Sequence, residues 1–358
     1  MQGYKIAAIP GDGIGKEVIA SGLRVLEALA QRDGSFRLSV ETFEWGSDRY
    51  KAVGSLMPED GAERLKAFDA IFFGAVGAPD VPDHLTLWGL RLAICQSLDQ
   101  YANVRPTRIL PGIRSPLRGV DAGDLDWVIV RENSEGEYAG QRGRSHRGLP
   151  EEVATEVAIF TRARVGRIMR FAFELARSRP RKLLTVVTKS NAQRYGMVLW
   201  DEIARGVSAD FPDVTCDKML VDAMTVRMTL NPRSLNTIVA TNLHADILSD
   251  LAAALAGSIG IAPTANLNPE RRYPSMFEPI HGSAFDITGK GIANPIGTFW
   301  SATMMLQHLG EHAAADRLMR AIERVTGDNR LHTPDLGGEA RTDEVTEAVI
   351  AAIHGDNA

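Results

Sequence analysis

The chain has 358 residues, of which 44% are hydrophobic and 24% charged, and its formal net charge is −5. These proportions are those of a folded protein of about two domains, and they exclude a disordered chain, a collagen-like repeat and a disulfide-stapled mini-protein. The negative net charge also argues against general binding to nucleic acid.

Short apolar runs alternate with helical patterns along the chain. The patterns predict helices at 16–32 and around 165–172, and strands at 4–9, 70–73, 125–130, 183–187 and 237–240. This alternation is typical of an α/β fold with much parallel sheet. The segment 153–159 departs from the rhythm, because its apolar residues recur at every second position after a Gly- and Arg-rich stretch. It predicts a projecting β-arm.

Cysteine content and the apolar runs bear on the cell compartment. Cys95 and Cys216 are too few for a Cys-ligated zinc site, and a chain of this size does not need a disulfide. The longest uncharged run, 251–268, is interrupted by two glycines and a proline, whereas a membrane span needs about 20 mostly apolar residues. We therefore predict a cytoplasmic protein without a signal peptide or a membrane partner. The run itself predicts a buried helix ending near Gly257, followed by a loop.

Two aspartates, Asp246 and Asp250, follow the strand predicted at 237–240. Residues four apart share one face of a helix, so the two carboxylates repel each other unless a cation lies between them. They can be solvated acids near a helix N-terminus, which the helix dipole favours, or ligands of a hard divalent cation such as Mg²⁺ or Mn²⁺. Asp222, which apolar residues flank, is a candidate third ligand.

Four further polar residues are candidates for substrate chemistry. Arg105 and Arg131 lie in or directly after apolar segments, and two arginines together can clamp carboxylates, although each alone is often a structural ion pair. Lys189 follows the strand at 183–187, and Tyr138 lies beyond Arg131. A neighbouring cation can bring the pKa of a lysine into a useful range, so both are candidate acid–base groups.

Two glycine-rich segments are possible cofactor sites. Gly11-Asp-Gly-Ile-Gly15 has the spacing G-x-G-x-G instead of the Rossmann spacing G-x-G-x-x-G, and it predicts a tight strand-to-helix turn. The segment from Glu278 to Asn294 contains a Gly-Ser turn whose backbone N–H groups can bind a phosphate. Asp286 can accept hydrogen bonds from a ribose 2′-OH and repels a 2′-phosphate, which favours NAD.

Together these segments resemble the β-decarboxylating dehydrogenases, the family of isopropylmalate, isocitrate, tartrate and D-malate dehydrogenases. The match runs from 9–15 to 333–338, and its most specific pieces are 242–250 and 277–287. The resemblance implies an isopropylmalate dehydrogenase-like two-domain α/β fold with a mixed, largely parallel sheet, and not a Rossmann fold. It implies a large domain on the cofactor side, formed by 1–100 and 257–358. It also implies a smaller central domain, 101–256, with a dimer-forming arm at about 138–160.

The resemblance also implies a homodimer with shared active sites that uses NAD, Mg²⁺ or Mn²⁺, and a monovalent cation such as K⁺. Asp246 and Asp250 would hold the divalent metal with the partner's Asp222. The partner's Lys189 would act as the base and Tyr138 as the acid. The substrate, a small dicarboxylate, would be bound by Arg105, Arg131, Asn191 and a further arginine, and the cofactor by Glu278, His281, Gly282, Ser283, Ala284, Asp286 and Asn294.

The chain departs from the family where a third substrate arginine usually lies ten positions before Arg105, because Cys95 stands there. Arg91 lies four residues earlier and is the predicted substitute, with a surface role as the alternative. Trp88 would then line the space that an isopropyl group occupies in isopropylmalate enzymes.

The segments 81–88 and 100–106 look most like those of the tartrate and D-malate members. We therefore predict the oxidation, with or without β-decarboxylation, of a small 2-hydroxy dicarboxylic acid. Three alternatives stay open: a 3-isopropylmalate dehydrogenase, a metal-dependent non-redox decarboxylase (a lyase), and a non-catalytic protein that binds small acids.

Overall fold

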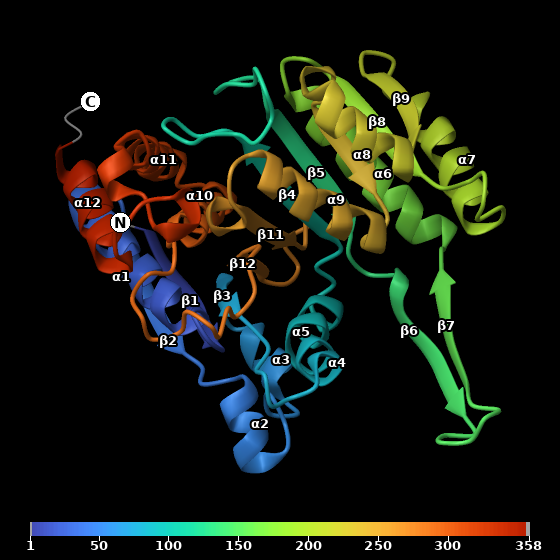
Figure 1. The fold of residues 1–358 in the computed structure, drawn as a ribbon, viewed down its shortest axis with the longest axis horizontal. Helices are drawn as coiled ribbons and strands as arrows, with labels where there is room; N and C mark the ends of the chain where they lie inside the picture. Colours follow the sequence, from blue (N-terminus) through green and yellow to red (C-terminus); the bar gives the residue numbers. More distant parts are fainter. Residues whose placement is uncertain (1, 356–358) are drawn as a thin grey trace.

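The computed structural model describes residues 2–355, in which a ten-stranded sheet is flanked by helices and a two-stranded sheet projects away from it (Figure 1). The strand order of the large sheet is β2-β1-β3-β12-β11-β4-β5-β10-β8-β9. The strands are β1 (Gln2–Gly11), β2 (Phe36–Thr42), β3 (Ala70–Ala75), β4 (Ala102–Arg108), β5 (Asp126–Glu132), β8 (Leu183–Thr188), β9 (Thr215–Leu220), β10 (Thr237–Ala240), β11 (Pro263–Leu267) and β12 (Ser275–Pro279).

The large sheet consists of two parallel blocks joined by an antiparallel seam. The first block is β2-β1-β3-β12 and the second is β5-β10-β8-β9. At the seam, β12, β11, β4 and β5 pair antiparallel, so the two blocks run in opposite directions. The mixed, largely parallel α/β sheet confirms the predicted fold class.

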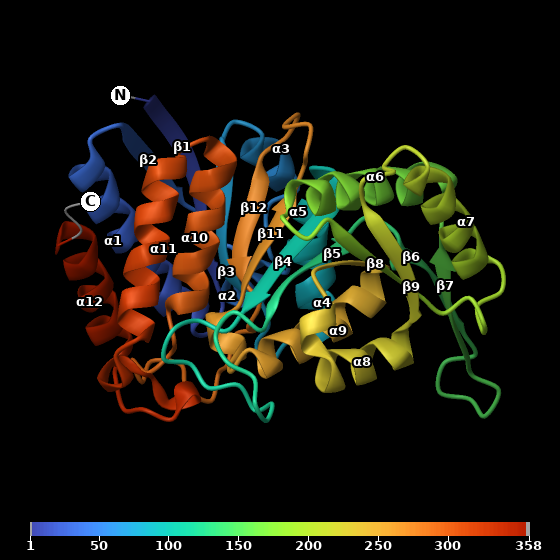
Figure 2. The same cartoon turned by 90° about the horizontal axis from the view of Figure 1, so that it is seen from above.

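Helices pack on both sides of the two blocks, as Figure 2 shows from above. Beside the first block, α1, α10, α11 and α12 pack together; around the second, α6 and α7 lie opposite α8 and α9. The helices are α1 (Gly15–Asp33), α2 (Ser47–Val53), α3 (Gly61–Leu65), α4 (Asp83–Thr86), α5 (Leu92–Ser97), α6 (Arg162–Ser178), α7 (Gly196–Ser208), α8 (Val221–Leu230), α9 (Asn242–Leu255), α10 (Ile296–Leu309), α11 (His312–Thr326), α12 (Thr342–Gly355), the π-helix η1 (Leu87–Arg91), and the 3₁₀ helices η2 (Pro232–Ser234), η3 (Ile259–Ile261), η4 (Asn329–Leu331) and η5 (Pro334–Leu336).

Side chains of successive strand residues point to opposite faces, and this alternation divides the core. Phe72 of β3 joins the main apolar cluster, which extends without a break through both blocks. Its neighbours Ile71 and Phe73 join a second cluster on the other face, with Met276 of β12 and Cys95 of α5. The second cluster lies beneath the segment that carries Arg91.

Two predicted local features are confirmed, and a third is wrong. The turn between β1 and α1 is tight, since Gly13 has φ +56° and a Cβ on it would lie 2.0 Å from the carbonyl oxygen of Ser283. Helix α9 ends at Leu255, as expected from the glycine that follows. The loop expected after it instead contains β11, a short strand that begins with Pro263 and is paired on both sides.

The predicted β-arm is present as the antiparallel pair β6 (Gly136–Ser145) and β7 (Val153–Ile159), which projects from the second block (Figure 1). Val153 and Val157 are 51% and 53% exposed on it. The strands from 101–256 lie side by side in the sheet, as do the strands from the two chain ends. The division into two domains stays a prediction. Within the described residues, every helix is too short or too polar to cross a lipid bilayer.

Candidate active site

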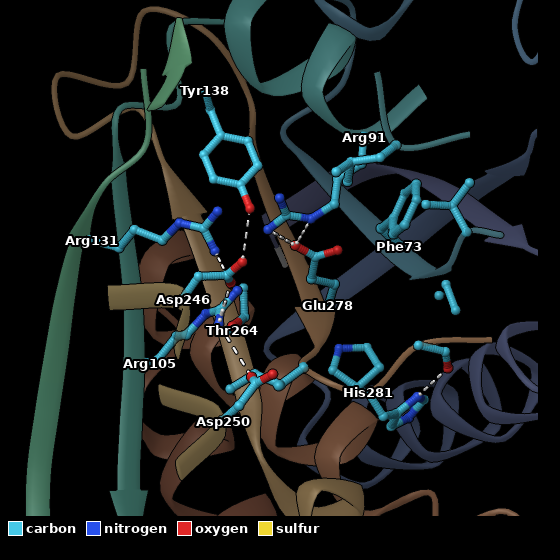
Figure 3. Close-up of a pocket in the computed structure, with 17 residues that line it drawn as sticks. Phe73, Arg91, Arg105, Arg131, Tyr138, Asp246, Asp250, Thr264, Glu278 and His281 are labelled. Carbon is cyan, nitrogen blue, oxygen red and sulfur yellow. Dashed lines mark hydrogen bonds and ion pairs between the residues drawn. The ribbon is translucent and has the colours of Figure 1, made fainter. Parts of the chain in front are cut away.

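A cavity of about 250 Å³ lies where the seam meets both blocks. It is bounded by the end of β3, by η1, by the base of β6, by α9, and by the segment from β12 to Gly282 (Figure 3). Three predicted arginines, both aspartates predicted as metal ligands, and Tyr138 line it. The fold therefore brings six of the predicted site residues to one place: Arg91, Arg105, Arg131, Tyr138, Asp246 and Asp250.

Helix α9 carries both aspartates, and its start is fixed by a cap. The Thr241 side chain accepts a hydrogen bond from the His244 N–H, so the helix begins directly after β10. Asp246 and Asp250 follow on one face, with side chains 33% and 59% exposed. The i, i+4 spacing thus places both carboxylates toward the cavity, as predicted.

Asp246 is the centre of the polar contacts in the cavity. Arg131 and Arg105 both donate to its Oδ1, Arg105 at 3.2 Å, and the Tyr138 hydroxyl donates to Oδ2 at 3.2 Å (Figure 3). Burial favours the neutral acid, but Arg131 and Arg105 outweigh it and hold the pKa of Asp246 below its ordinary value. Burial raises the pKa of Asp250, whose nearest cation is Arg105 at 3.9 Å.

The two arginines are held from behind by polar residues of α9. Arg105 donates to Ser249 Oγ at 2.5 Å, and Arg131 donates through Nε to Asn242 Oδ1 at 2.9 Å. Burial, together with the neighbouring Arg131, lowers the pKa of Arg105 to about 10. The Arg131 guanidinium also lies 5.3 Å from the centre of the Tyr138 ring. Burial, reinforced by Asp246, raises the pKa of Tyr138 and keeps its hydroxyl protonated.

The carboxylates fit a divalent cation only as part of a larger ligand set. Across residues 2–355, no group of three or more His, Cys, Asp or Glu side chains is arranged to hold a metal ion. Asp246 and Asp250 nevertheless offer oxygen donors at one cavity, the donor type that Mg²⁺ and Mn²⁺ prefer. The remaining ligands would have to come from water, from a substrate or from a second subunit.

Lys189, Asn191 and Asp222 do not line the cavity of their own chain. Lys189 follows β8, Asp222 lies in the first turn of α8, and the Lys189 ammonium donates to Asp222 Oδ1 at 2.7 Å. This hydrogen bond holds the pKa of Asp222 below its ordinary value. Asn191 is exposed nearby in the chain. The structure thus groups the lysine with the third aspartate, on an exposed part of the second block.

Arg91 enters the cavity from η1 and forms a buried ion pair. Its Nη2 lies 2.7 Å from Glu278 Oε1, and its side chain is 11% exposed. The alternative of a surface arginine is therefore wrong. Cys95 is 1% exposed in the second apolar cluster, where burial raises the pKa of its thiol to about 11.

The predicted role of Trp88 is wrong, because Leu87 lines the cavity and Trp88 does not. The reason is the wider π-helical turn, in which the Leu92 N–H donates to the Leu87 carbonyl five residues back. In such a turn Leu87 and Arg91 share a face, whereas Trp88 turns toward the arm. Its ring lies 4.6 Å from the Arg142 guanidinium.

The predicted cofactor residues form one strip from β12 to Asn294. Glu278, His281 and Gly282 line the cavity, whereas Ser283 binds the turn after β1 by accepting a hydrogen bond from the Ile14 N–H at 2.8 Å. Along the rest of the strip, Ala284 is half-buried, Asp286 is exposed, and the Asn294 side chain donates to Asp335 at 3.0 Å.

Two observations on the strip fit a bound dinucleotide. Buried His281 has no hydrogen-bond partner at Nε2, and burial lowers the pKa of its imidazole, which keeps the ring neutral. A Cβ on Gly282 would meet no atom within 4 Å, so the backbone there is open to a ligand.

Several polar residues around the cavity were not predicted from the sequence because they are neutral amides and hydroxyls. Alternation along β4 puts Asn103 on the same face as Arg105, which is a signal that the sequence contained. Asn242 and Ser249 lie one turn from Asp246 on α9, which is a second such signal. Asn266 could not be found in this way, since cross-strand register sets it opposite Asn103. Asn133, directly after β5, is placed by a backbone hydrogen bond from its N–H to the Tyr101 carbonyl.

Comparison with known proteins agrees with this fold and site. A family model described as isocitrate/isopropylmalate dehydrogenase matches residues 5–349. A probable tartrate dehydrogenase/decarboxylase of Agrobacterium vitis is 75% identical over 357 residues, covering 100% of this chain and 99% of that protein. The D-malate dehydrogenase (decarboxylating) of Escherichia coli strain K12 is 50% identical over 360 residues, covering 99% of each. The crystal structure of isocitrate dehydrogenase from Methylococcus capsulatus is 34% identical with a TM-score of 0.89, covering 98% of this chain and 99% of that one.

The mixed sheet and a cavity in which carboxylates face arginines define a decarboxylating dehydrogenase that uses NAD and a divalent metal ion. The chain belongs to the isocitrate/isopropylmalate dehydrogenase family. The predicted family, fold class and enzyme class are thereby confirmed.

Proposed function

We propose that this enzyme oxidises D-malate or tartrate with NAD and with Mg²⁺ or Mn²⁺, with or without decarboxylation. A monovalent cation such as K⁺ belongs to the proposal as an activator. The enzyme would work as a cytoplasmic homodimer whose active sites are shared between subunits, without a nucleic-acid or membrane partner. The relatives named for tartrate and D-malate, at 75% and 50% identity, support this substrate class.

The observation that carries the proposal is the content of the cavity. Three arginines and two aspartates line a space of about 250 Å³, which is small for a drug-sized ligand and suited to a four-carbon acid. Arg105 and Arg131 would bind the carboxylates, because a guanidinium matches a carboxylate with two parallel hydrogen bonds. A large branched apolar group would meet charged and polar side chains along about half of the lining.

In the proposed mechanism, Asp246 and Asp250 would hold the divalent cation with the partner's Asp222. A cation bound there would supply Lewis-acid stabilisation of negative charge on the substrate hydroxyl and during decarboxylation, and NAD would supply the hydride acceptor. The partner's Lys189 takes the hydroxyl proton. Tyr138, whose phenol stays protonated, donates a proton to the carbon that loses CO₂.

The test of the proposed function is kcat/KM for D-malate, the active tartrates, isopropylmalate and isocitrate, with NAD and Mn²⁺. D-malate or a tartrate should be preferred. Preference for isopropylmalate would support the first alternative. Release of CO₂ without any growth of NADH absorbance with every acid tested would support a lyase, and binding without turnover would support a binding protein.

Cofactor choice gives a second expected outcome. NAD should be used more efficiently than NADP, because the exposed Asp286 carboxylate accepts hydrogen bonds from a 2′-OH and repels a 2′-phosphate of about −1.5 to −2 charge. The measurement is kcat/KM for each cofactor at saturating D-malate and Mn²⁺. Asp286→Asn should lower the ratio of kcat/KM with NAD to kcat/KM with NADP. Equal efficiency of the two cofactors in the wild type would contradict the role of Asp286.

Arg91→Ala should raise KM for D-malate by the equivalent of roughly 2–5 kcal/mol, because the pair with Glu278 is buried and its loss leaves a carboxylate without its cation. Arg233→Ala, which removes an arginine paired with Asp124 on the surface, is the matched control and should leave KM unchanged. A near-native kcat/KM for Arg91→Ala would leave Arg105 and Arg131 as the only carboxylate clamps.

A further inference from the structure

Arg91 is held in the cavity by two neighbours on the seam, Glu278 and Asn266. Its Nε and Nη2 lie 2.8 and 2.7 Å from the same oxygen, Glu278 Oε1 (Figure 3). Its Nη2 also donates to Asn266 Oδ1 at 3.3 Å. Asn266 in turn donates to Glu278 Oε1 at 2.7 Å. Two of the three guanidinium nitrogens are therefore engaged, and no hydrogen bond donated by Nη1 is found among residues 2–355.

The orientation of Asn266 is dictated by a buried amide row behind it. Its Oδ1 accepts from Asn103 at 2.7 Å and from Asn133 at 3.2 Å, as well as from Arg91. Asn266 and Asn103 are directly opposite each other on β11 and β4, and all three asparagines are at most 2% exposed. Because three donors meet the carbonyl, the Asn266 amide has to point its N–H₂ at Glu278.

We propose that Asn266 and Glu278 are positioning residues for Arg91, and this inference rests on the proposed function. They hold the guanidinium by two nitrogens so that only its Nη1 edge meets the substrate. The ordinary arginine position carries the buried Cys95, and Arg91 reaches the cavity from a different turn. A long side chain arriving this way needs a partner that fixes its rotamers, since an arginine loses about 2 kcal/mol of rotamer entropy when it is immobilised.

The pair also keeps Arg91 away from Asp246. Arg105 and Arg131 already donate to that carboxylate, and a third guanidinium would occupy the oxygen that faces Tyr138. Glu278 competes for Arg91 and balances its charge. Counted together, the three arginines balance Asp246, Asp250 and Glu278, so that a divalent cation and a dicarboxylate enter a cavity without net charge. A substrate carrying a third carboxylate would leave one charge uncompensated.

The test is a double-mutant cycle on KM for D-malate, using Asn266→Ala, Arg91→Ala and the two changes together. Asn266→Ala should raise KM roughly 10-fold, because a hydrogen bond to a charged group is lost. The KM for NAD should stay unchanged. In the Arg91→Ala background, Asn266→Ala should add nothing, since its effect passes through the arginine.

The control is Asn236→Ala, which removes another buried asparagine that accepts from an arginine, Arg179 at 2.9 Å. This variant should lose stability without changing either KM. If Asn266→Ala does not fold, Asn103→Ala takes its place in the cycle, because it removes a donor that orients the Asn266 amide and leaves Glu278 unchanged. Equal rises in KM in both backgrounds, or a change confined to the KM for NAD, would overturn the positioning role.

Failure of this inference is distinct from failure of the proposed function. The acid that the wild type oxidises best replaces D-malate in the cycle, so that preference for isopropylmalate would refute the function and still test the positioning. The same double-mutant cycle can also be measured without turnover. The readout is the rise in melting temperature that increasing concentrations of the acid produce in the presence of Mg²⁺. If Asn266→Ala and Arg91→Ala reduce this rise additively, the inference is wrong even for an enzyme that turns over D-malate.

Discussion

Asp246→Asn should lower kcat and the affinity for Mn²⁺ by more than about 100-fold, which is the upper end of the effect of changing a group that only supports a metal ligand. The substitution keeps the shape of the side chain and removes one of two carboxylates at the cavity. Asp250→Asn should have an effect of the same kind. The Mn²⁺ affinity of each variant can be measured by titration calorimetry, without any turnover.

The contacts of Asp246 separate loss of metal from loss of substrate binding. Arg131 and Arg105 both donate to this carboxylate, so its neutralisation frees two guanidinium groups at the cavity. Binding of a dicarboxylate without metal should therefore be preserved or strengthened in Asp246→Asn. The control is Asp124→Asn, at a carboxylate paired with Arg233 on the surface. It should leave the affinity for Mn²⁺ and the affinity for the dicarboxylate unchanged. Unchanged Mn²⁺ titrations in both cavity variants would refute the proposed metal site.

Lys189→Ala and Asp246→Asn homodimers should each be inactive, and mixing the two proteins should restore about a quarter of the wild-type activity. Random exchange makes about half of the dimers mixed, and a mixed dimer has one site with both lesions and one with neither. The structure motivates this expectation, because Lys189 and Asp222 pair with each other and do not line the cavity of their own chain.

The exchange itself has to be shown independently of activity. Native mass spectrometry of differently tagged chains identifies the mixed dimer, and a Lys182→Ala chain, which loses a surface pair with Asp213, serves as the matched lysine control. Mixed dimers without recovered activity would contradict the shared site. Activity of a Lys189→Ala homodimer near that of the wild type would contradict the assignment of the base.

Regular elements of this chain could be predicted from the periodicity of its residues. Asp246 and Asp250 were predicted to share a helix face, and they do, because α9 is regular from its cap onward. Trp88 was misplaced because nothing in its local pattern announces a π-helical turn, and one extra residue per turn redirects every side chain in it. Regular elements can be extrapolated from spacing alone, whereas an irregular turn cannot.

Long-range pairing accounts for the rest of what was missed. Strand β11 is short, begins with proline and follows a helix, so its strand character comes from pairing with β12 and β4. Asn266 acquires its role from the same register, which sets it opposite Asn103. No property of a single segment contains that information.

The order of strands in the first block has a consequence for how the chain is made. Strand β3 ends at Ala75, yet its neighbour β12 begins only at Ser275, so the edge of β3 stays open until most of the chain has left the ribosome. The second block is drawn from one continuous stretch and can assemble earlier. An apolar strand edge that waits for a distant partner is exposed to wrong pairing, and contacts so far apart in sequence slow folding. Newly synthesised chains are therefore expected to depend on chaperones between the emergence of β3 and that of β12.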